Sequence, residues 1–333
     1  MEFTHAVIDL DPIKYAVSSV SEKKTIKAVH RQSGDEYDLK TRTEFWGHYK
    51  KKAGGQLAEM NKELSDDNKR LPEDFDIYDI VTPEPLSFAL HTAKAMTDDI
   101  ISQSGCKTYS ALVGKGDSWR VEESTLLKYK GNRAETVKPY HYDAVVDYLT
   151  KRYEAEVVTD VEVDDRLVMD TYRRDGFFAI AKEKDIYSSA MYFFDYSKPD
   201  KGIQNGNQFG ELFLNAKGEV KGIGRKHWMW QVCSEDSADN YKANCFSEKD
   251  WGSKSAYNAL IAAANDKELF QAAVDIFKVL YPEPKVVKGW RGDEIEITWD
   301  YVMQEMMVMA WMLRHEDDSV PLIKTLDKLG VAY

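Results

Sequence analysis

Carboxylate side chains gather at four places along this sequence, and three of these places follow predicted strands. The predicted strands are short apolar runs at 5–9, 156–158 and 177–181. If they lie parallel in one sheet, their carboxyl ends meet at one edge, where open α/β folds place their chemistry. Several carboxylates at one point repel each other unless a cation lies among them. The acidic residues are Asp9 and Asp11; Glu162, Asp164 and Asp165; Glu183 and Asp185; and Asp236 and Asp239.

The four acidic groups offer oxygen ligands and contain no histidine or cysteine. Such a ligand set favours a hard cation such as Mg²⁺ or Mn²⁺. Two such ions about 4 Å apart can activate a water and stabilise the leaving oxygen of a phosphoryl displacement. The pattern therefore predicts two-metal phosphodiester chemistry.

Each acidic group also has a simpler explanation, which for Asp9 and Asp11 is a strand capped by an Asp-Pro turn. Asp164 and Asp165 at a helix start compensate the helix dipole, which is worth under about 1 kcal/mol. The segment 183–185 reads equally as a polar turn, and Asp239 with Asn240 as a helix cap. It is the joint placement of the groups at strand ends that favours a functional site.

The segment 119–138 is basic and aromatic. Its lysines and arginine suit a phosphate backbone, and its aromatic side chains suit base stacking. A lysine–arginine pair beside a cation site can also offset charge on a transferring phosphate. The alternative is a solvated helix face. The residues concerned are Lys128, Lys130, Arg133 and Lys138, interleaved with Trp119, Tyr129 and Tyr140.

Composition describes a globular intracellular protein. The 333 residues are 43% hydrophobic and 31% charged, and the net charge is −12, so any nucleic-acid site requires its basic residues to be segregated on one face. Cys106, Cys233 and Cys245 show no metal-ligand spacing, which favours free thiols in a reducing cytoplasm. Asp9 and Asp11 stand where a secretion signal needs apolar residues, and we expect no membrane association.

The remaining elements predict an α/β fold. Helical apolar spacing at 85–102, 142–153 and 164–174 alternates with strands, and a further strand is predicted at 109–113; this alternation favours a mostly parallel sheet. The segment 21–85 is irregular. After it come a strand at 191–194, a hairpin of 209–214 with 219–223, and helices at 228–233, 254–265, 267–280 and 301–314.

Four of these segments resemble the motifs of one family, in the family's order. Tyr129-Lys130-Gly131-Asn132-Arg133 matches a YKxNR element, and Glu162 to Asp165 matches E-x-D-D. Glu183-Lys184-Asp185 stands where the family has D-x-D, and 235–240 where it has G-D-x-x-D-N. With Asp9 in the first strand, the chain resembles the 5′-nuclease superfamily of flap endonucleases and 5′→3′ exonucleases, especially its bacteriophage members.

The resemblance implies a PIN-like α/β catalytic domain over 1–205, with a helical arch at about 119–153. It implies a helical region over 206–333 that resembles the helix-three-turn-helix duplex-binding element. By motif position, Mg²⁺, replaceable by Mn²⁺, would be held at two positions, and Lys130 and Arg133 would steer the scissile phosphate. The first ion would be held by Asp9, Glu162, Asp164 and Asp185, and the second ion or its waters by Asp165, Glu183, Asp236 and Asp239.

Three departures from the family pattern stand out. Glu183 replaces an aspartate, Glu235 replaces a glycine, and the turn at 241–252 is long and poor in glycine. Lys254, in the Trp251-Gly252-Ser253-Lys254 stretch, is the expected basic contact for nucleic acid there. Asp11 and Asp117 are further candidates at strand ends.

The predicted activity is Mg²⁺-dependent 5′→3′ exonuclease or flap endonuclease cleavage of DNA, and of RNA in RNA–DNA duplexes, in phage-type replication and primer removal. The expected partners are DNA with a 5′ end or flap and other replication proteins, with the chain a monomer in the host cytoplasm. Two alternatives stay open: a PIN-type endoribonuclease, and a catalytically silent structure-specific DNA-binding protein.

Overall fold

The computed structural model describes residues 2–47, 54–116, 118–133, 137–182 and 184–333. These residues form two compact units. The first comprises 1–13, 95–137 and 146–333, and the second comprises 14–94 and 138–145. The division differs in kind from the boundary at 205/206 that the sequence suggests, which stays a prediction. No helix among the described residues has the length and apolarity needed to cross a bilayer.

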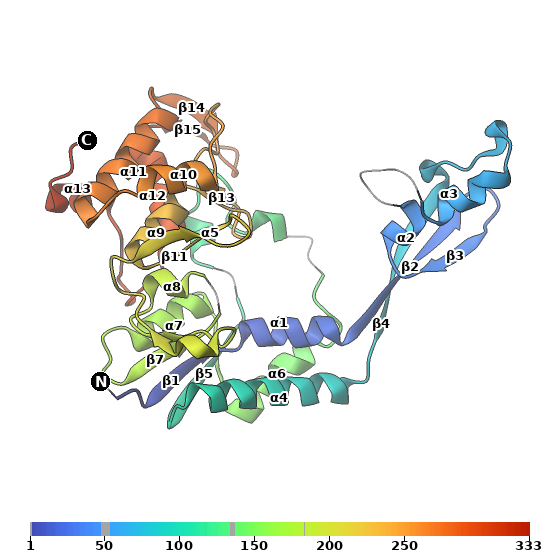
Figure 1. Cartoon of the computed structure of the whole chain (residues 1–333), viewed down its shortest axis with the longest axis horizontal. Helices are drawn as coiled ribbons and strands as arrows, with labels where there is room; N and C mark the ends of the chain where they lie inside the picture. Colours follow the sequence, from blue (N-terminus) through green and yellow to red (C-terminus); the bar gives the residue numbers. More distant parts are fainter. Residues whose placement is uncertain (1, 48–53, 117, 134–136, 183) are drawn as a thin grey trace. The chain divides into compact units, whose positions relative to one another are not determined.

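A six-stranded sheet organises the first unit (Figure 1). Its order is β6-β5-β1-β7-β8-β9, and every neighbouring pair is parallel except β8 with β9. The expected α/β class with a mostly parallel sheet is confirmed. The strands are β1 (His5–Asp9), β5 (Thr108–Gly114), β6 (Glu156–Val158), β7 (Phe177–Ile180), β8 (Phe193–Phe194) and β9 (Ile203–Gln204).

The helix α7 (Val163–Thr171) covers the middle of this sheet. Its Leu167 and Val168 are buried in one cluster with Val7 of β1 and Leu112 of β5. Apolar side chains at helical spacing meet the apolar strand faces here, which is the main stabilising contact of such layers. Of the other helices, α5 (Arg120–Glu123) and α8 (Ile186–Ser189) belong to the first unit, whereas α1 (Asp11–Val20), α4 (Leu86–Ser104) and α6 (Tyr142–Tyr153) each have residues in both units.

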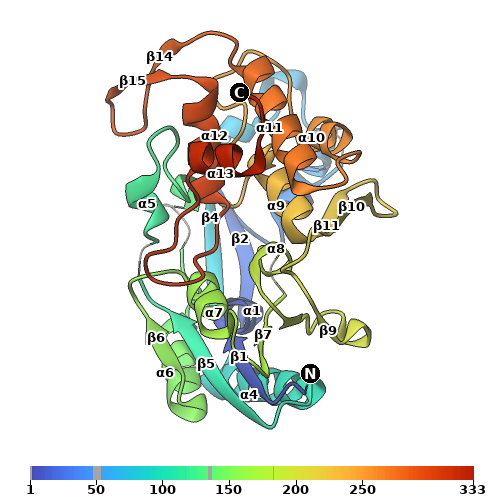
Figure 2. The ribbon, with the colours of Figure 1, turned by 90° about the vertical axis from the view of Figure 1, so that its left-hand side faces the viewer.

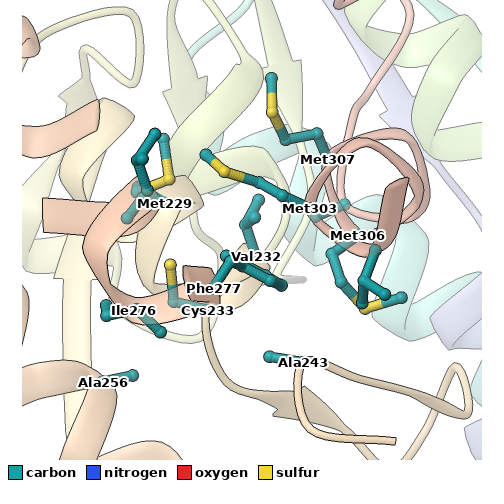
Figure 3. Close-up of a cluster of buried hydrophobic side chains, with 14 of the residues drawn as sticks. Met229, Val232, Cys233, Ala243, Ala256, Ile276, Phe277, Met303, Met306 and Met307 are labelled. Atoms are coloured by element: carbon teal, nitrogen blue, oxygen red, sulfur yellow. The ribbon is translucent and has the colours of Figure 1, made fainter. Parts of the chain in front are cut away.

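The chain after residue 210 builds a second core within the same unit. Methionines of α9 (Gly224–Val232) and α12 (Trp299–Met309) lie around Phe277 of α11 (Asp266–Leu280), as Figure 3 shows. Figures 1 and 2 place α8 between α7 and α9. The expected hairpin and four helices are present. The remaining elements are β10 (Glu211–Leu214), β11 (Val220–Ile223), β12 (Glu235–Asp236), β13 (Tyr241–Lys242), α10 (Ser253–Leu260), β14 (Lys285–Lys288), β15 (Glu294–Ile297) and α13 (Leu322–Leu329).

The second unit contains the segment that looked irregular in sequence. A nine-residue antiparallel ladder joins β2 (Glu22–His30) to β4 (Phe75–Pro83), and β3 (Glu36–Leu39) pairs on the other side of β2. Its own small core contains Ile26, Phe45 and Phe75. Most of β4 is exposed on both faces, so its sequence lacks the alternation that marks a half-buried strand. The short helices α2 (Arg42–Trp46) and α3 (Gln56–Met60) also belong to this unit.

Candidate functional site

Three of the acidic segments leave the same edge of the sheet. Asp9 is the last residue of β1 and is buried. Glu162 precedes α7, four residues after the end of β6, and Asp185 precedes α8, five residues after the end of β7. Because β6, β5, β1 and β7 are parallel, their carboxyl ends lie together. Asp164 lies in the first turn of α7.

Four carboxylates from distant segments form one electrostatic cluster: Glu162, Asp185, Asp236 and Asp239. Asp236 ends β12, and Asp239 lies in the turn between β12 and β13. Burial and the charges of Asp236, Asp185 and Glu162 raise the pKa of Asp239 to about 6, against an opposing effect of Lys130. Burial and the charge of Asp236 likewise raise the pKa of Asp185. Carboxylates affect one another in this way only at short range.

The segment around Lys130 is fixed directly on this cluster. The Lys130 amide donates to the Asp239 carbonyl oxygen over 2.9 Å, and the Arg133 Nε donates to the Ala238 carbonyl oxygen over 2.8 Å. The Asn240 side chain donates in return to the Lys128 carbonyl oxygen over 2.9 Å. Two motifs about a hundred residues apart in sequence are therefore one structural element.

Lys130 has a strained backbone. Its φ angle is +53°, in the left-handed region that residues with a side chain rarely adopt. Residues held in this way are concentrated at functional sites, because neighbouring contacts must maintain the conformation. The bond from the Lys130 amide to Asp239 is one such contact.

Two lysines neutralise the clustered carboxylates. Lys130 forms an ion pair with Glu162, and its Nζ lies 3.7 Å from Asp239. Lys184 forms an ion pair with Asp236. Although burial opposes ionisation, Arg120 and Lys130 hold the pKa of Glu162 below its ordinary value. The carboxylate charges also raise the pKa of both lysines against the effect of their burial.

Asp165 is fully buried and saturated by protein donors. Its Oδ1 accepts bonds from Arg120 and from the Leu313 amide, and its Oδ2 accepts bonds from Arg120 and the Trp119 indole, all within 2.8–2.9 Å. The same Arg120 lies 2.5 Å from Glu162. These contacts favour a positioning role for Asp165, and its expected part in binding the second ion stays a prediction.

Tyr129 is buried, and the prediction that its ring stacks on a base is therefore wrong. Its ring is 2% exposed and packs in the core of the C-terminal region, so neither ring face is open to a base. Its hydroxyl donates to Glu162 over 3.0 Å. Tyr129 therefore helps to hold a cluster carboxylate.

The other candidates occupy varied positions. Arg133, Lys128 and Lys254 are exposed, as a contact surface requires. Asp11 accepts a bond from the Gly114 amide over 2.8 Å, which ties the end of β5 to the start of α1. Glu183 and Asp117 lie outside the described residues.

Sequence reasoning missed Arg120, Lys184 and Gln231. Arg120 lies in the basic segment and Lys184 in the D-x-D-like motif, so each stood beside a recognised signal. Gln231 donates to Asp185 and accepts from Ser188 over 3.1 Å. Nothing local distinguishes it from other polar residues of α9.

The donor chemistry of the cluster fits Mg²⁺ or Mn²⁺, since all four side chains are carboxylates. Among the described residues, however, no three acidic, histidine or cysteine side chains converge closely enough to hold an ion. The ammonium groups of Lys130 and Lys184 lie on carboxylate oxygens that such an ion needs. Glu162, Asp185, Asp236 and Asp239 offer the carboxylate oxygens that a divalent cation would take as ligands.

Comparison with solved structures finds matches of low structural similarity. A T5 protein co-crystallised with metal ions matches at a TM-score of 0.36 and 15% identity, over 73% of this chain and 82% of the other. A mutant of the T5 5′-exonuclease matches at 0.33 and 13%, over 68% of this chain and 76% of the other. A bacteriophage T5 flap endonuclease variant, in a pseudo-enzyme-product complex with DNA and metal ions, matches at 0.32 and 14%, over 68% and 90%.

All three TM-scores are below 0.5, so these likenesses carry no conclusion about the function of this chain. No family model matches the sequence. No curated protein matches it either.

Proposed function

We propose that this chain is a metal-dependent 5′ nuclease that hydrolyses phosphodiester bonds of DNA. One observation carries the proposal: carboxylates from three distant segments, 162, 185 and 236–239, meet where the backbone amide of Lys130 and the side chain of Arg133 are bonded to the 238–239 backbone. A carboxylate cluster with a lysine and an arginine beside it suits phosphoryl transfer, in which positioning and charge compensation are the main requirements.

The residues divide into three roles. Glu162, Asp185, Asp236 and Asp239, with Asp9 and Asp164 at the same edge, would bind two Mg²⁺ ions, and Mn²⁺ in their place. Bound divalent cations supply Lewis acids for an attacking water and a leaving oxygen. Lys130 and Arg133 would bind the scissile phosphate, and the exposed Lys128 and Lys254 would bind flanking phosphates.

The substrate we propose is DNA with a 5′ end or flap, together with RNA in RNA–DNA duplexes, as replication and primer removal require. The motif pattern supports this choice, because Tyr129 to Arg133 and Glu162 to Asp165 occur in the order of the 5′-nuclease motifs. The 5′→3′ direction and the flap preference rest on the same resemblance.

A 5′-labelled flap duplex, incubated with the chain and Mg²⁺, tests the proposal when product lengths are resolved. Asp185→Asn should lower cleavage about 100-fold or more by removing a ligand charge, while flap binding stays nearly unchanged. Asp175→Asn is the matched control, since Asp175 is an exposed carboxylate before β7.

Three results would contradict the proposal. Undiminished Mg²⁺-dependent cleavage by D185N would show that Asp185 is not part of the site. Tight flap binding without product at any Mg²⁺ or Mn²⁺ concentration would identify a silent DNA-binding protein. Cleavage of single-stranded RNA in preference to the flap would identify an endoribonuclease.

A further inference from the structure

Lys184 binds the carboxylate oxygen of Asp236 that a metal ion would take as a ligand. Its ammonium pairs with Asp236, whose side chain is only 4% exposed. The other oxygen of Asp236, Oδ1, accepts bonds from the Ala238 and Asp239 amides over 2.9 and 3.3 Å. Oδ2 is thus the oxygen of Asp236 that faces a cation, and Lys184 holds it.

Among the cationic side chains, Lys184 has the largest stabilising effect on the ionised form of Asp185. Asp185 and Asp236 repel each other, and Lys184 attracts both. Two carboxylates in a partly desolvated place are costly unless a positive charge compensates them. In the described structure, the compensation at Asp236 comes from the side chain of this neighbouring lysine.

Lys184 differs from Lys130, the other lysine on the cluster. Lys130 is fixed by its backbone bond to Asp239 and has an expected role on the phosphate. The side chain of Lys184 is 44% exposed, and its flexible four-carbon stem can turn into solvent at small cost. Lys184 is therefore a counter-ion that can leave.

We propose that Lys184 is a built-in counter-ion that competes with a divalent cation for the Asp185–Asp236 pair. The inference rests on the proposed function. Without metal, the lysine stabilises the two carboxylates. When a divalent cation binds, its two charges replace the single charge of the ammonium, which turns away from Asp236. Lys184 would thereby set the metal affinity of this position.

Isothermal titration calorimetry with Mn²⁺ on the full metal-free chain tests the inference. Lys184→Met removes the competing charge and keeps the length of the side chain, so Mn²⁺ should bind about tenfold more tightly. Lys182→Met makes the same change of net charge at an exposed lysine two residues earlier, with the Tyr196 ring beside it; its Mn²⁺ affinity should match that of the wild type. Lys184→Arg keeps the competing charge and should bind no more tightly than the wild type.

Thermal unfolding in chelator provides a second readout that needs no activity. K184M should melt at a lower temperature than the wild type, because Asp185 and Asp236 lose their counter-ion. Mn²⁺ should raise the melting temperature of K184M by more than it raises that of the wild type. Unchanged or weaker Mn²⁺ binding by K184M would overturn the inference. An equal gain in K182M, or tighter binding by K184R, would also overturn it.

The two proposals fail in distinguishable ways. If the wild type binds Mn²⁺ and cleaves the flap while K184M binds like the wild type, only the role of Lys184 is wrong. If the wild type binds Mn²⁺ in competition with Lys184 but cleaves no nucleic acid, the counter-ion role stands and the nuclease proposal is wrong.

Discussion

At the scale of single residues, one buried guanidinium connects much of the candidate site. Arg120 is fully buried and bonds to both oxygens of Asp165, to Glu162 and to the carbonyl oxygen of Trp311. Its guanidinium also lies 4.7 Å from the ring centre of Trp119. A planar fork of donors suits such a set of acceptors, which an ammonium cannot match.

Arg120→Met should destabilise the protein by about 3–5 kcal/mol, because the fully buried Asp165 loses its charged partner and Glu162 keeps only Lys130 as a counter-ion among the described residues. Urea unfolding measures this change. Arg120→Lys keeps the charge but loses the bidentate geometry, and its stability should lie between that of the wild type and that of R120M. A loss below about 1 kcal/mol for R120M would contradict the assigned role.

At the scale of elements, the C-terminal region holds the segment that leads to Lys130. Glu305 of α12 accepts bonds from the Thr125 and Leu126 amides over 3.0 and 2.9 Å. Arg291, in the β14–β15 turn, donates to the carbonyl oxygens of Val121, Glu122 and Ser124. A segment with little regular structure thus obtains its backbone partners from elements about 170 residues later.

Glu305→Ala should cost about 2–4 kcal/mol in unfolding free energy, since it leaves two amides, one of them fully buried, without an acceptor. The amide hydrogens of Thr125 and Leu126 should exchange faster by hydrogen-exchange mass spectrometry. Glu305→Gln keeps one acceptor oxygen and serves as the control. Unchanged exchange in E305A would show that the contacts do not restrain this segment.

The helix α9 carries a buried histidine that makes stability depend on pH. Burial, with smaller effects of Lys184 and Lys221, lowers the pKa of His227 from 6.5 to about 3. Its ring stacks on Trp230 at 5.5 Å between centres. The folded state therefore favours neutral His227, so this contribution to stability is complete above pH 6.5 and falls as pH drops toward 3.

His227→Phe keeps the ring and removes the titration. Between pH 6 and 4 the wild type should lose up to about 1.4 kcal/mol per pH unit more than H227F. Denaturant unfolding at several pH values measures the difference. Parallel stability curves for the two proteins would show that His227 does not stay neutral in the folded state.

At the scale of the whole molecule, the candidate site belongs to one compact unit. All of its described residues fall within 1–13, 95–137 and 146–333. The second unit has a separate core, and its β2–β4 ladder closes where the Glu84 amide donates to the Ser21 carbonyl oxygen over 2.9 Å. The two ends of the segment 22–83, called the insertion below, are therefore adjacent.

Replacing residues 22–83 with a short turn should leave the first unit folded, because the excision joins adjacent backbone ends and removes no strand of the central sheet. Circular dichroism and Mn²⁺ calorimetry should show retained helix and retained metal binding. A chain that loses its cooperative unfolding transition would show that the first unit needs the insertion.

The sequence by itself determined the parallel sheet and the segments that bring carboxylates to its edge, because apolar periodicity and short motifs are local properties. It did not determine β4, whose exposed faces leave no alternating pattern. Tertiary structure alone decided the partners: Lys184 on Asp236, Arg120 on Asp165, and Tyr129 turned inward to Glu162. Such pairings join residues 33 to 52 positions apart. They depend on which charged side chains are buried next to one another after the chain has folded.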